Sequence, residues 1–347
     1  MVGTRNKTYG EAAAKANNAG IYVSGINNVI EGLTLANGAT ATTGYSYGIY
    51  LLASTNNTII GNICGNSSSD THCYGIYLNG SADNMIARNT CSNSVFVSSI
   101  YCVGINLLDS ELNIIRENIC SNTGVSVRGI SVEGHENAGG NNTIADNICN
   151  NSSVSSSYGG CVGIGVTTDC NNIVGNVCNN SLVNTAGNGT LYCITVHAQG
   201  NTVVGNVCNG AVSGGDIGAR SCGIAVGGHN QSIVGNILSN SASDSSQVYC
   251  LGILFEAVVE NCIVSNCVCS GKEESFLGFA LAIDNGTIPR EVDRIQVINC
   301  NFRNWAEYGT GVFTLDYNTA SALPGSSTTI AAFSGIGTGS VAGFNMV

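Results

Sequence analysis

Charged residues and prolines are both scarce in this chain. Asp, Glu, Lys and Arg together make up 10% of the 347 residues, and there are only 2 prolines. No run of about 18 apolar residues occurs, so we expect no membrane-spanning helix. Residues 1–20 also lack the apolar stretch of a secretory signal peptide. The long Leu- and Ala-rich runs of helical repeat proteins are missing too, which argues against a helical solenoid.

The few charges that are present are mostly negative. The formal net charge is −11 and the sequence pI is about 4.6. Nucleic acids and anionic membranes are bound through an excess of Lys and Arg, so we expect neither as a partner, and no membrane insertion. The same acidity argues against polyanionic substrates such as polygalacturonate or alginate.

Asparagine and glycine are abundant, and one short segment recurs along the chain. Its clearest copy is Asn142–Cys149, in which an Asn is followed by Ile-Cys, and successive Asn anchors are 27 to 33 residues apart. A period this steady indicates one structural unit stacked on itself as a solenoid. The predicted anchors are Asn62, Asn89, Asn118, Asn147, Asn176, Asn206, Asn236, Asn266 and Asn299. A predicted second column, two residues further on, holds Cys64, Cys91, Cys120, Cys149, Cys178, Cys208, Leu238 and Val268.

Most units also contain a Gly-Ile-x-Leu/Val signature, as in Gly48–Leu51, Gly75–Leu78 and Gly104–Leu107. Short β-branched runs with alternating apolar positions, bounded by Gly, Asn and Ser, are typical of β-strands. We therefore predict two or three short strands in each coil. Each strand would pair in parallel with its copy about 4.8 Å away.

The Asn-x-Thr-Ile-x-x-Asn-x-Cys spacing resembles the right-handed parallel β-helix repeat of the pectate-lyase-like superfamily. That superfamily includes polysaccharide lyases and hydrolases, phage tailspikes and NosD-type periplasmic proteins. The resemblance implies an all-β, right-handed parallel β-helix of about ten coils over residues 20–302. We expect an N-terminal helical cap over residues 1–19 and a C-terminal cap or oligomerisation module over residues 303–347.

Several blocks of the superfamily's enzymes are absent from this sequence. The segments that surround a lyase's catalytic Arg are missing, and so is the Asp-Pro-His block of alginate-epimerase-type β-helices. His and Met residues are few and scattered, which gives little support to NosD-like copper handling. The resemblance therefore favours the fold over any one activity.

The 17 cysteines are predicted to be reduced and buried. Their number is odd, and Cys alternates with Leu and Val in one column, as expected for a small buried apolar residue. Disulfides among Cys73, Cys102, Cys161 and Cys250 remain an alternative. A line of single thiols about 29 residues apart does not predict a tetrahedral metal site.

Valine and isoleucine recur at positions predicted to face outward. An exposed apolar stripe usually marks an interface, so we predict side-by-side packing of solenoids, as a homotrimer. The alternative is a long loop folded over the stripe. Its predicted members are Val174, Val204, Val234, Val264, Val177, Val207 and Ile237.

The scarce charges gather in turns after the Gly-Ile strands of adjacent units. Two carboxylates about 5–10 Å apart are what glycoside hydrolysis requires, so the predicted catalytic residues are Asp109, Glu111, Glu133, Glu136 and Asp169. The predicted substrate-binding residues, chosen as rings and donors suited to sugars, are Tyr74, Tyr101, Tyr158, His135 and His197. We predict no cofactor, although the same carboxylates could hold Ca²⁺. The simpler alternative is that the charged groups only face water and that the tyrosines fill space beneath loops.

Three functions follow from these observations. The first is a tailspike-like appendage at a virion surface that binds a cell-surface polysaccharide. This hypothesis leaves open whether the protein also cleaves the polysaccharide. The second is an extracellular polysaccharide hydrolase or lyase. The third is a structural or adhesive solenoid without catalysis, so the sequence leaves open whether the protein is an enzyme.

Overall fold

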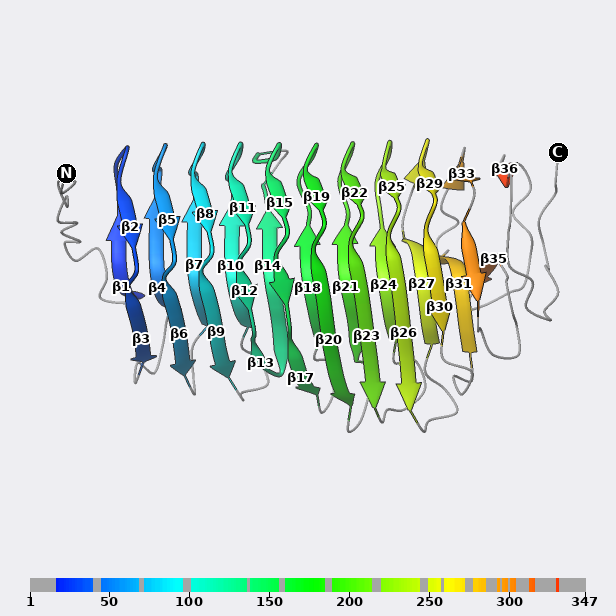
Figure 1. Cartoon of the computed structure of the whole chain (residues 1–347), viewed down its shortest axis with the longest axis horizontal. Helices are drawn as coiled ribbons and strands as arrows, with labels where there is room; N and C mark the ends of the chain where they lie inside the picture. Colours follow the sequence, from blue (N-terminus) through cyan, green and yellow to red (C-terminus); the bar gives the residue numbers. More distant parts are fainter. Residues whose placement is uncertain are drawn as a thin grey trace.

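The computed structural model describes the repeats almost continuously. The described residues are 17–39, 45–68, 72–95, 101–135, 138–155, 160–184, 189–213, 220–243, 249–256, 259–271, 277–284, 292–293, 295–298, 300–303, 312–315 and 329–330. All regular secondary structure within these ranges is β-strand. The strands of successive coils follow one another along the long axis of the molecule (Figure 1). None of the described segments is a helix long and apolar enough to cross a membrane.

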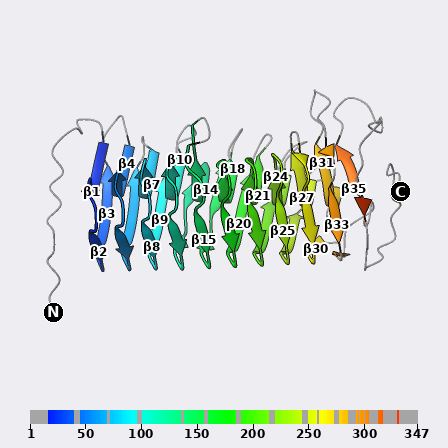
Figure 2. The same cartoon turned by 90° about the horizontal axis from the view of Figure 1, so that it is seen from above.

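Each coil contributes one strand to each of three parallel sheets, as the two views show (Figures 1 and 2). The first sheet contains β1 (Asn17–Val23), β4 (Tyr45–Leu52), β7 (His72–Asn79), β10 (Tyr101–Leu108), β14 (Ser126–Glu133), β18 (Gly160–Val166), β21 (Thr190–Val196), β24 (Arg220–Val226), β27 (Tyr249–Glu256), β31 (Leu277–Asp284) and β35 (Val312–Leu315). The second sheet contains β2 (Val29–Glu31), β5 (Thr58–Ile60), β8 (Met85–Ala87), β11 (Ile114–Arg116), β15 (Thr143–Ala145), β19 (Asn172–Val174), β22 (Thr202–Val204), β25 (Ser232–Val234), β29 (Ile263–Ser265), β33 (Gln296–Ile298) and β36 (Thr329–Ile330).

The third sheet is more irregular, because in two coils its strand is split in two. It contains β3 (Thr34–Ala39), β6 (Ile63–Ser68), β9 (Thr90–Val95), β12 (Ile119–Cys120), β13 (Thr123–Gly124), β16 (Ile148–Cys149), β17 (Ser152–Ser155), β20 (Val177–Asn184), β23 (Val207–Ser213), β26 (Ile237–Ser243), β30 (Val268–Gly271) and β34 (Asn301–Arg303). A separate pair is formed by β28 (Val259–Glu260) and β32 (Val292–Asp293). The Ser-, Asn- and Gly-rich composition of residues 65–73 and 240–250 predicts variable loops there. Instead, residues 65–68 belong to β6 and residues 240–243 to β26 of this third sheet.

The predicted parallel β-helix is confirmed. The first and second sheets each contain 11 strands, close to the predicted number of about ten coils. Strands β35 and β36 extend these two sheets, so parts of the predicted C-terminal module continue the stack. At the other end β1 begins at Asn17, so Asn17 and Asn18 are strand residues, although the sequence favoured a helix there. The rest of that predicted helix lies outside the described residues.

The core is a file of side chains from all three sheets. Ile49, Ile76 and Ile105 stack in register in the first sheet and are fully buried. The predicted cysteine column stacks in the third sheet, where Cys64, Cys91, Cys120, Cys149, Cys178 and Cys208 are all buried. All 17 cysteines are free thiols, and only Cys170 is exposed, so the reduced, buried stack is confirmed.

The predicted anchor Asn266 is displaced by one residue from the Asn ladder, and the predicted anchor Asn299 lies outside the described residues. Asn236 donates its side-chain amide to Cys267 Sγ (3.9 Å), so Cys267 occupies the Asn position of that coil. Asn266 instead has φ of +54°, as Arg88, Glu117 and Asp146 have in the positions before earlier anchors. The same shift places Cys269, rather than Val268, beside Leu238, and it buries Val264 completely. Val264 is therefore a core residue and does not belong to the outward stripe.

Three ladders of Asn side chains tie the coils together at the corners. In the predicted ladder, Asn147 Oδ1 accepts both the backbone N–H (2.9 Å) and the side-chain amide (3.0 Å) of Asn118. The Asn147 amide in turn donates to Ile115 O and to Asn176 Oδ1. Buried amides satisfied in this way stabilise the stack along its axis. Two ladders that were not predicted run through Asn57, Asn84 and Asn113 and through Asn93, Asn122 and Asn151.

Candidate functional site

Aromatic side chains gather on the outer face of the first sheet over its first four strands. Tyr50 alternates with the core residues Ile49 and Leu51, so its ring points away from the core. Tyr47 stacks on Tyr50 with ring centroids 4.9 Å apart, so it lies on the same outer face. We call this cluster the aromatic platform. Its members are Tyr22, Tyr45, Tyr47, Tyr50, His72, Tyr74, Tyr77 and Tyr101.

The rings of the platform stack from coil to coil because their residues are in register. His72 lies between Tyr45 (ring centroids 5.3 Å apart) and Tyr101 (5.5 Å), with interplanar angles of 20° and 26°. In a second row Tyr47 stacks on Tyr74 at 5.3 Å. Parallel pairing therefore turns a sequence repeat into a continuous aromatic surface.

The centre of the platform is packed and its rim is open. Tyr47 is 5% exposed, whereas Tyr45 and Tyr101 are 42% and 45% exposed. Burial, with smaller contributions from neighbouring charges and phenols, raises the pKa of Tyr77 to about 12 and raises the pKa of Tyr47 further. The phenols therefore stay neutral and can both donate and accept hydrogen bonds.

His72 is held in a defined protonation state. Its Nδ1 accepts the backbone N–H of Tyr101 at 2.9 Å, which requires an unprotonated Nδ1. Burial lowers the pKa of His72, which also favours the neutral ring. His72 is therefore an uncharged member of the platform.

Arg128 connects the platform to the charged turns. Its guanidinium lies 5.7 Å from the centre of the Tyr101 ring, and it also donates to Ser131 Oγ (3.0 Å) and to Glu133 Oε1. Ser131 donates to the same Glu133 oxygen at 2.8 Å. The Glu133 carboxylate is thus engaged by two neighbours at the end of the platform.

Asp109 pairs with His135 on the neighbouring coil. Its Oδ1 accepts the His135 backbone N–H (2.7 Å), and its Oδ2 lies 2.9 Å from His135 Nδ1. Burial is the largest single contribution and raises the pKa of Asp109, but the two hydrogen bonds and the charge of His135 together outweigh it, so the net pKa is lowered. An acid that stays ionised is poorly suited to protonate a leaving group.

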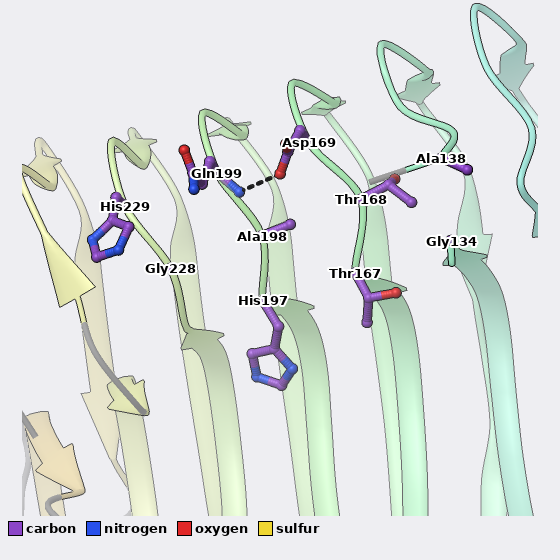
Figure 3. A pocket seen from close by; sticks show the side chains of 10 residues that line it. All are labelled: Gly134, Ala138, Thr167, Thr168, Asp169, His197, Ala198, Gln199, Gly228 and His229. Atoms are coloured by element: carbon purple, nitrogen blue, oxygen red, sulfur yellow. Dashed lines mark hydrogen bonds between the residues drawn. The ribbon is translucent and has the colours of Figure 1, made fainter. Parts of the chain in front are cut away.

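Beyond these pairs, the turns that follow β14, β18, β21 and β24 enclose a polar furrow of about 260 Å³ (Figure 3). Its lining includes Thr167, Asp169, His197, Gln199 and His229. Asp169 Oδ1 accepts the Gln199 backbone N–H at 2.7 Å. His229 Nδ1 is buried and has no hydrogen-bond partner among the described residues. An unpaired buried ring nitrogen in a polar furrow is a group that a bound ligand or water can satisfy.

His197 is oriented by a carboxylate two coils away. Its Nε2 lies 3.1 Å from Glu256 Oε2, and the hydroxyl of the partly buried Tyr192 donates to Glu256 Oε1 at 3.0 Å. Gly227 stands between them, and a Cβ there would lie 3.0 Å from His197 Cδ2. Glycine therefore leaves room for the imidazole to reach Glu256. If Nε2–H donates to Glu256, Nδ1 of His197 can take up a proton, as a general base does.

The predicted catalytic residues are only partly brought together. Asp109 and Glu133 lie on neighbouring coils, since Asp109 N–H donates to Glu133 O at 2.9 Å. Glu111 and Asp169 stand two steps apart in one column of the turn, with Gly140 between them. Glu136 and Tyr158 lie outside the described residues. The predicted catalytic role of these carboxylates stays a prediction.

Of the predicted binding residues, Tyr74 and Tyr101 belong to the platform, His135 pairs with Asp109, and His197 lines the furrow. The sequence reasoning missed the column of Tyr22, Tyr50 and Tyr77. Each fills the variable position of a Gly-Ile-x-Leu/Val signature, so their recurrence was a usable signal. His229 and the pairing of His197 with Glu256 had no such signal.

Metal binding finds no site among the described residues. They contain no group of three or more His, Cys, Asp or Glu side chains arranged to hold an ion. The sulfur of Met85, a potential soft ligand, lies 4.0 Å from the Arg116 guanidinium, a position that a cation would not share. The Ca²⁺ alternative therefore stays an untested prediction.

Comparison with known proteins supports the fold. The sequence model of the family "Periplasmic copper-binding protein (NosD)" matches residues 2–160. Copper does not fit the described residues of this chain, for the reasons just given. Among curated proteins, none matches the sequence.

Two solved structures from Azotobacter vinelandii are similar. The mannuronan C-5 epimerase AlgE6 A-module is 11% identical with a TM-score of 0.35, covering 89% of this chain and 90% of its own. The mannuronan C-5 epimerase AlgE4 A-module is 12% identical with a TM-score of 0.24, covering 83% and 90%.

Proposed function

We propose that this β-helix binds a polysaccharide along the outer face of its first sheet. The observation that carries the proposal is the aromatic platform and its continuation into Arg128, Glu133 and the furrow. Sugar rings pair apolar C–H faces with hydroxyl groups, and Tyr offers both an apolar ring and a polar hydroxyl. A row of such side chains repeated along the solenoid axis suits a linear chain of sugars.

The chemistry of the face favours an uncharged or weakly charged glycan. The chain has a net charge of −11, so a polyanionic polysaccharide would be repelled. Burial shifts the pKa values of Tyr47, Tyr74 and His72 toward the uncharged forms, so the packed part of the platform offers neutral rings. Recognition would therefore rest on hydrogen bonds and ring contacts.

The test compares two rim substitutions with a control on another face. Tyr45→Ala and Tyr101→Ala remove exposed rings without emptying the packed centre. Each is expected to weaken binding to a cognate neutral polysaccharide about tenfold, the effect of roughly 1.4 kcal/mol. Affinity electrophoresis against a panel of neutral polysaccharides, followed by calorimetry, measures this. Ile63→Ala, which alters a third-sheet residue that is 49% exposed, should bind normally. Equal affinities for all four proteins, or no binding to any glycan, would overturn the proposal.

Catalysis on the bound glycan is a second candidate function, favoured by the orientation of His197. A reducing-end assay on each polysaccharide that binds would detect cleavage. If the furrow is the active site, His197→Ala and Glu256→Gln abolish turnover while binding at the platform persists. Glu133→Gln tests the site predicted from the sequence in the same assay. Binding without turnover in the wild-type protein would identify the molecule as an adhesive solenoid.

A tailspike-like appendage at a virion surface, built as a homotrimer, is the narrower form of this proposal. A long solenoid with a lateral glycan-binding face suits such a rod, and it equally suits an extracellular protein of another kind. Mass spectrometry of purified virus particles and of the extracellular fraction of the source would separate the two locations.

A further inference from the structure

The second and third sheets form a face that is free of charge over four consecutive coils. Residues 172–184, 202–213, 232–243 and 263–271 contain no Asp, Glu, Lys, Arg or His. They comprise β19 with β20, β22 with β23, β25 with β26, and β29 with β30, which succeed one another along the rod (Figure 1). We call this surface the neutral face. On a chain with a net charge of −11, such an area is conspicuous.

The neutral face carries rows of β-branched side chains. Val174, Val204 and Val234 are in register on the second sheet. Val177, Val207 and Ile237 are in register on the third sheet, and Ile237 is 49% exposed. These two rows flank the corner of the solenoid. Together they form the part of the predicted apolar stripe that the structure retains.

The corner between the two rows carries glycine in three of the four coils. Gly175, Gly205 and Gly235 occupy it with φ between +63° and +65°. The three preceding coils have Arg88, Glu117 and Asp146 in the equivalent positions, and the first two coils have Gly32 and Gly61. Apart from the residues next to them in the chain, no atom lies within 4 Å of where a Cβ of Gly205 or Gly235 would be, whereas Asp146 Oδ1 lies 2.5 Å from that point at Gly175. The corner therefore offers space into which another surface can approach closely.

A row of exposed amides completes the face. The side-chain amide of Asn179 donates to Asn150 Oδ1 (3.1 Å), and that of Asn209 donates to Asn179 Oδ1 (2.8 Å). These amides partly satisfy one another along the axis, so covering them costs less than burying free polar groups.

We infer that the neutral face packs against the same face of a second copy of this chain. Two acidic copies repel each other wherever their charges meet, and this face removes that repulsion. Both copies also repeat at the same coil spacing, so rows of Val and Ile on one copy can fit between rows on the other over three coils. Exposed apolar rows of this extent usually mark an interface. The proposed glycan track lies on the first sheet, so both surfaces can be used at once.

Sedimentation velocity at micromolar concentration tests the inference. The wild-type chain is expected to sediment as an oligomer, while Val207→Glu and, independently, Asn209→Glu shift it to monomer by weakening self-association at least about a hundredfold. Thr167→Glu adds the same charge at an exposed position in the furrow and should leave the oligomer intact. Circular dichroism checks that each variant keeps its β-structure.

The inference is overturned if the wild-type chain is a monomer at 100 µM, a concentration of about 10⁻⁴ M that detects weak association. It is equally overturned if both neutral-face variants associate as the wild type does. Polysaccharide binding by Val207→Glu should match the wild type, so failure of self-association and failure of glycan binding are separate results.

Discussion

His72 lies between the rings of Tyr45 and Tyr101 and accepts the Tyr101 N–H at Nδ1. His72 can accept this hydrogen bond only while its Nδ1 is unprotonated. By contrast, protonation of His135 strengthens its pairing with the Asp109 carboxylate. The contacts of these two histidines, which lie two coils apart, thus favour opposite protonation states. Their surroundings, which the sequence does not display, decide the difference.

Mild acid should loosen the aromatic platform through His72. Its pKa is lowered in the folded chain, so its stabilising contribution is complete above the unfolded value near 6.5 and is lost as the pH falls through the folded value. The thermal midpoint measured by tyrosine near-UV circular dichroism is therefore expected to drop between pH 7.5 and pH 5. His72→Asn, which keeps a hydrogen-bond acceptor but does not titrate there, should show a smaller drop. An equal drop in both proteins would contradict the assignment.

At the scale of the element, each coil is stabilised by the buried Asn side chains at its corners. Periodicity alone predicted the strands of the first sheet, the cysteine column and one Asn ladder, because these depend on residues that recur at one spacing. It misplaced Asn266 because Cys267 substitutes for Asn in that coil by donating through sulfur to Ile233 O. It also read part of the third sheet as loop, since Ser- and Asn-rich strands lack the β-branched pattern of the other two.

The Asn ladder is testable with a matched pair of substitutions three residues apart. Asn147→Ala removes four hydrogen bonds from a fully buried position and leaves Ile115 O without that partner. Unsatisfied buried groups cost about 1–3 kcal/mol each, so a loss of roughly 3 kcal/mol is expected. Asn150→Ala alters an exposed amide and should change stability by less than about 0.5 kcal/mol. Urea unfolding followed by circular dichroism measures both, and similar losses would argue against a structural ladder.

At the scale of the whole molecule, two faces of the solenoid have different characters. The first sheet carries aromatic rings and leads to a polar furrow, and the neutral face carries small uncharged side chains. The furrow could not be predicted in full, because the contact between His197 and Glu256 spans two coils and depends on Gly227. The repeat spacing predicts which residues stack in register from coil to coil. It does not predict which side chains contact residues of another position, as His197 contacts Glu256.

Every part of this account requires that residues about 29 positions apart lie directly over one another. Asn150 and Asn179 are such neighbours, and Asn209 is one coil further on. In-register parallel neighbours are about 4.8 Å apart, within the range that a disulfide spans. In a Cys170→Ser background, Asn150→Cys with Asn179→Cys should form a disulfide under mild oxidation, detected by peptide mass spectrometry. Asn150→Cys with Asn209→Cys should not. Cross-linking of the second pair, or failure of the first, would contradict the stacking on which both proposed surfaces depend.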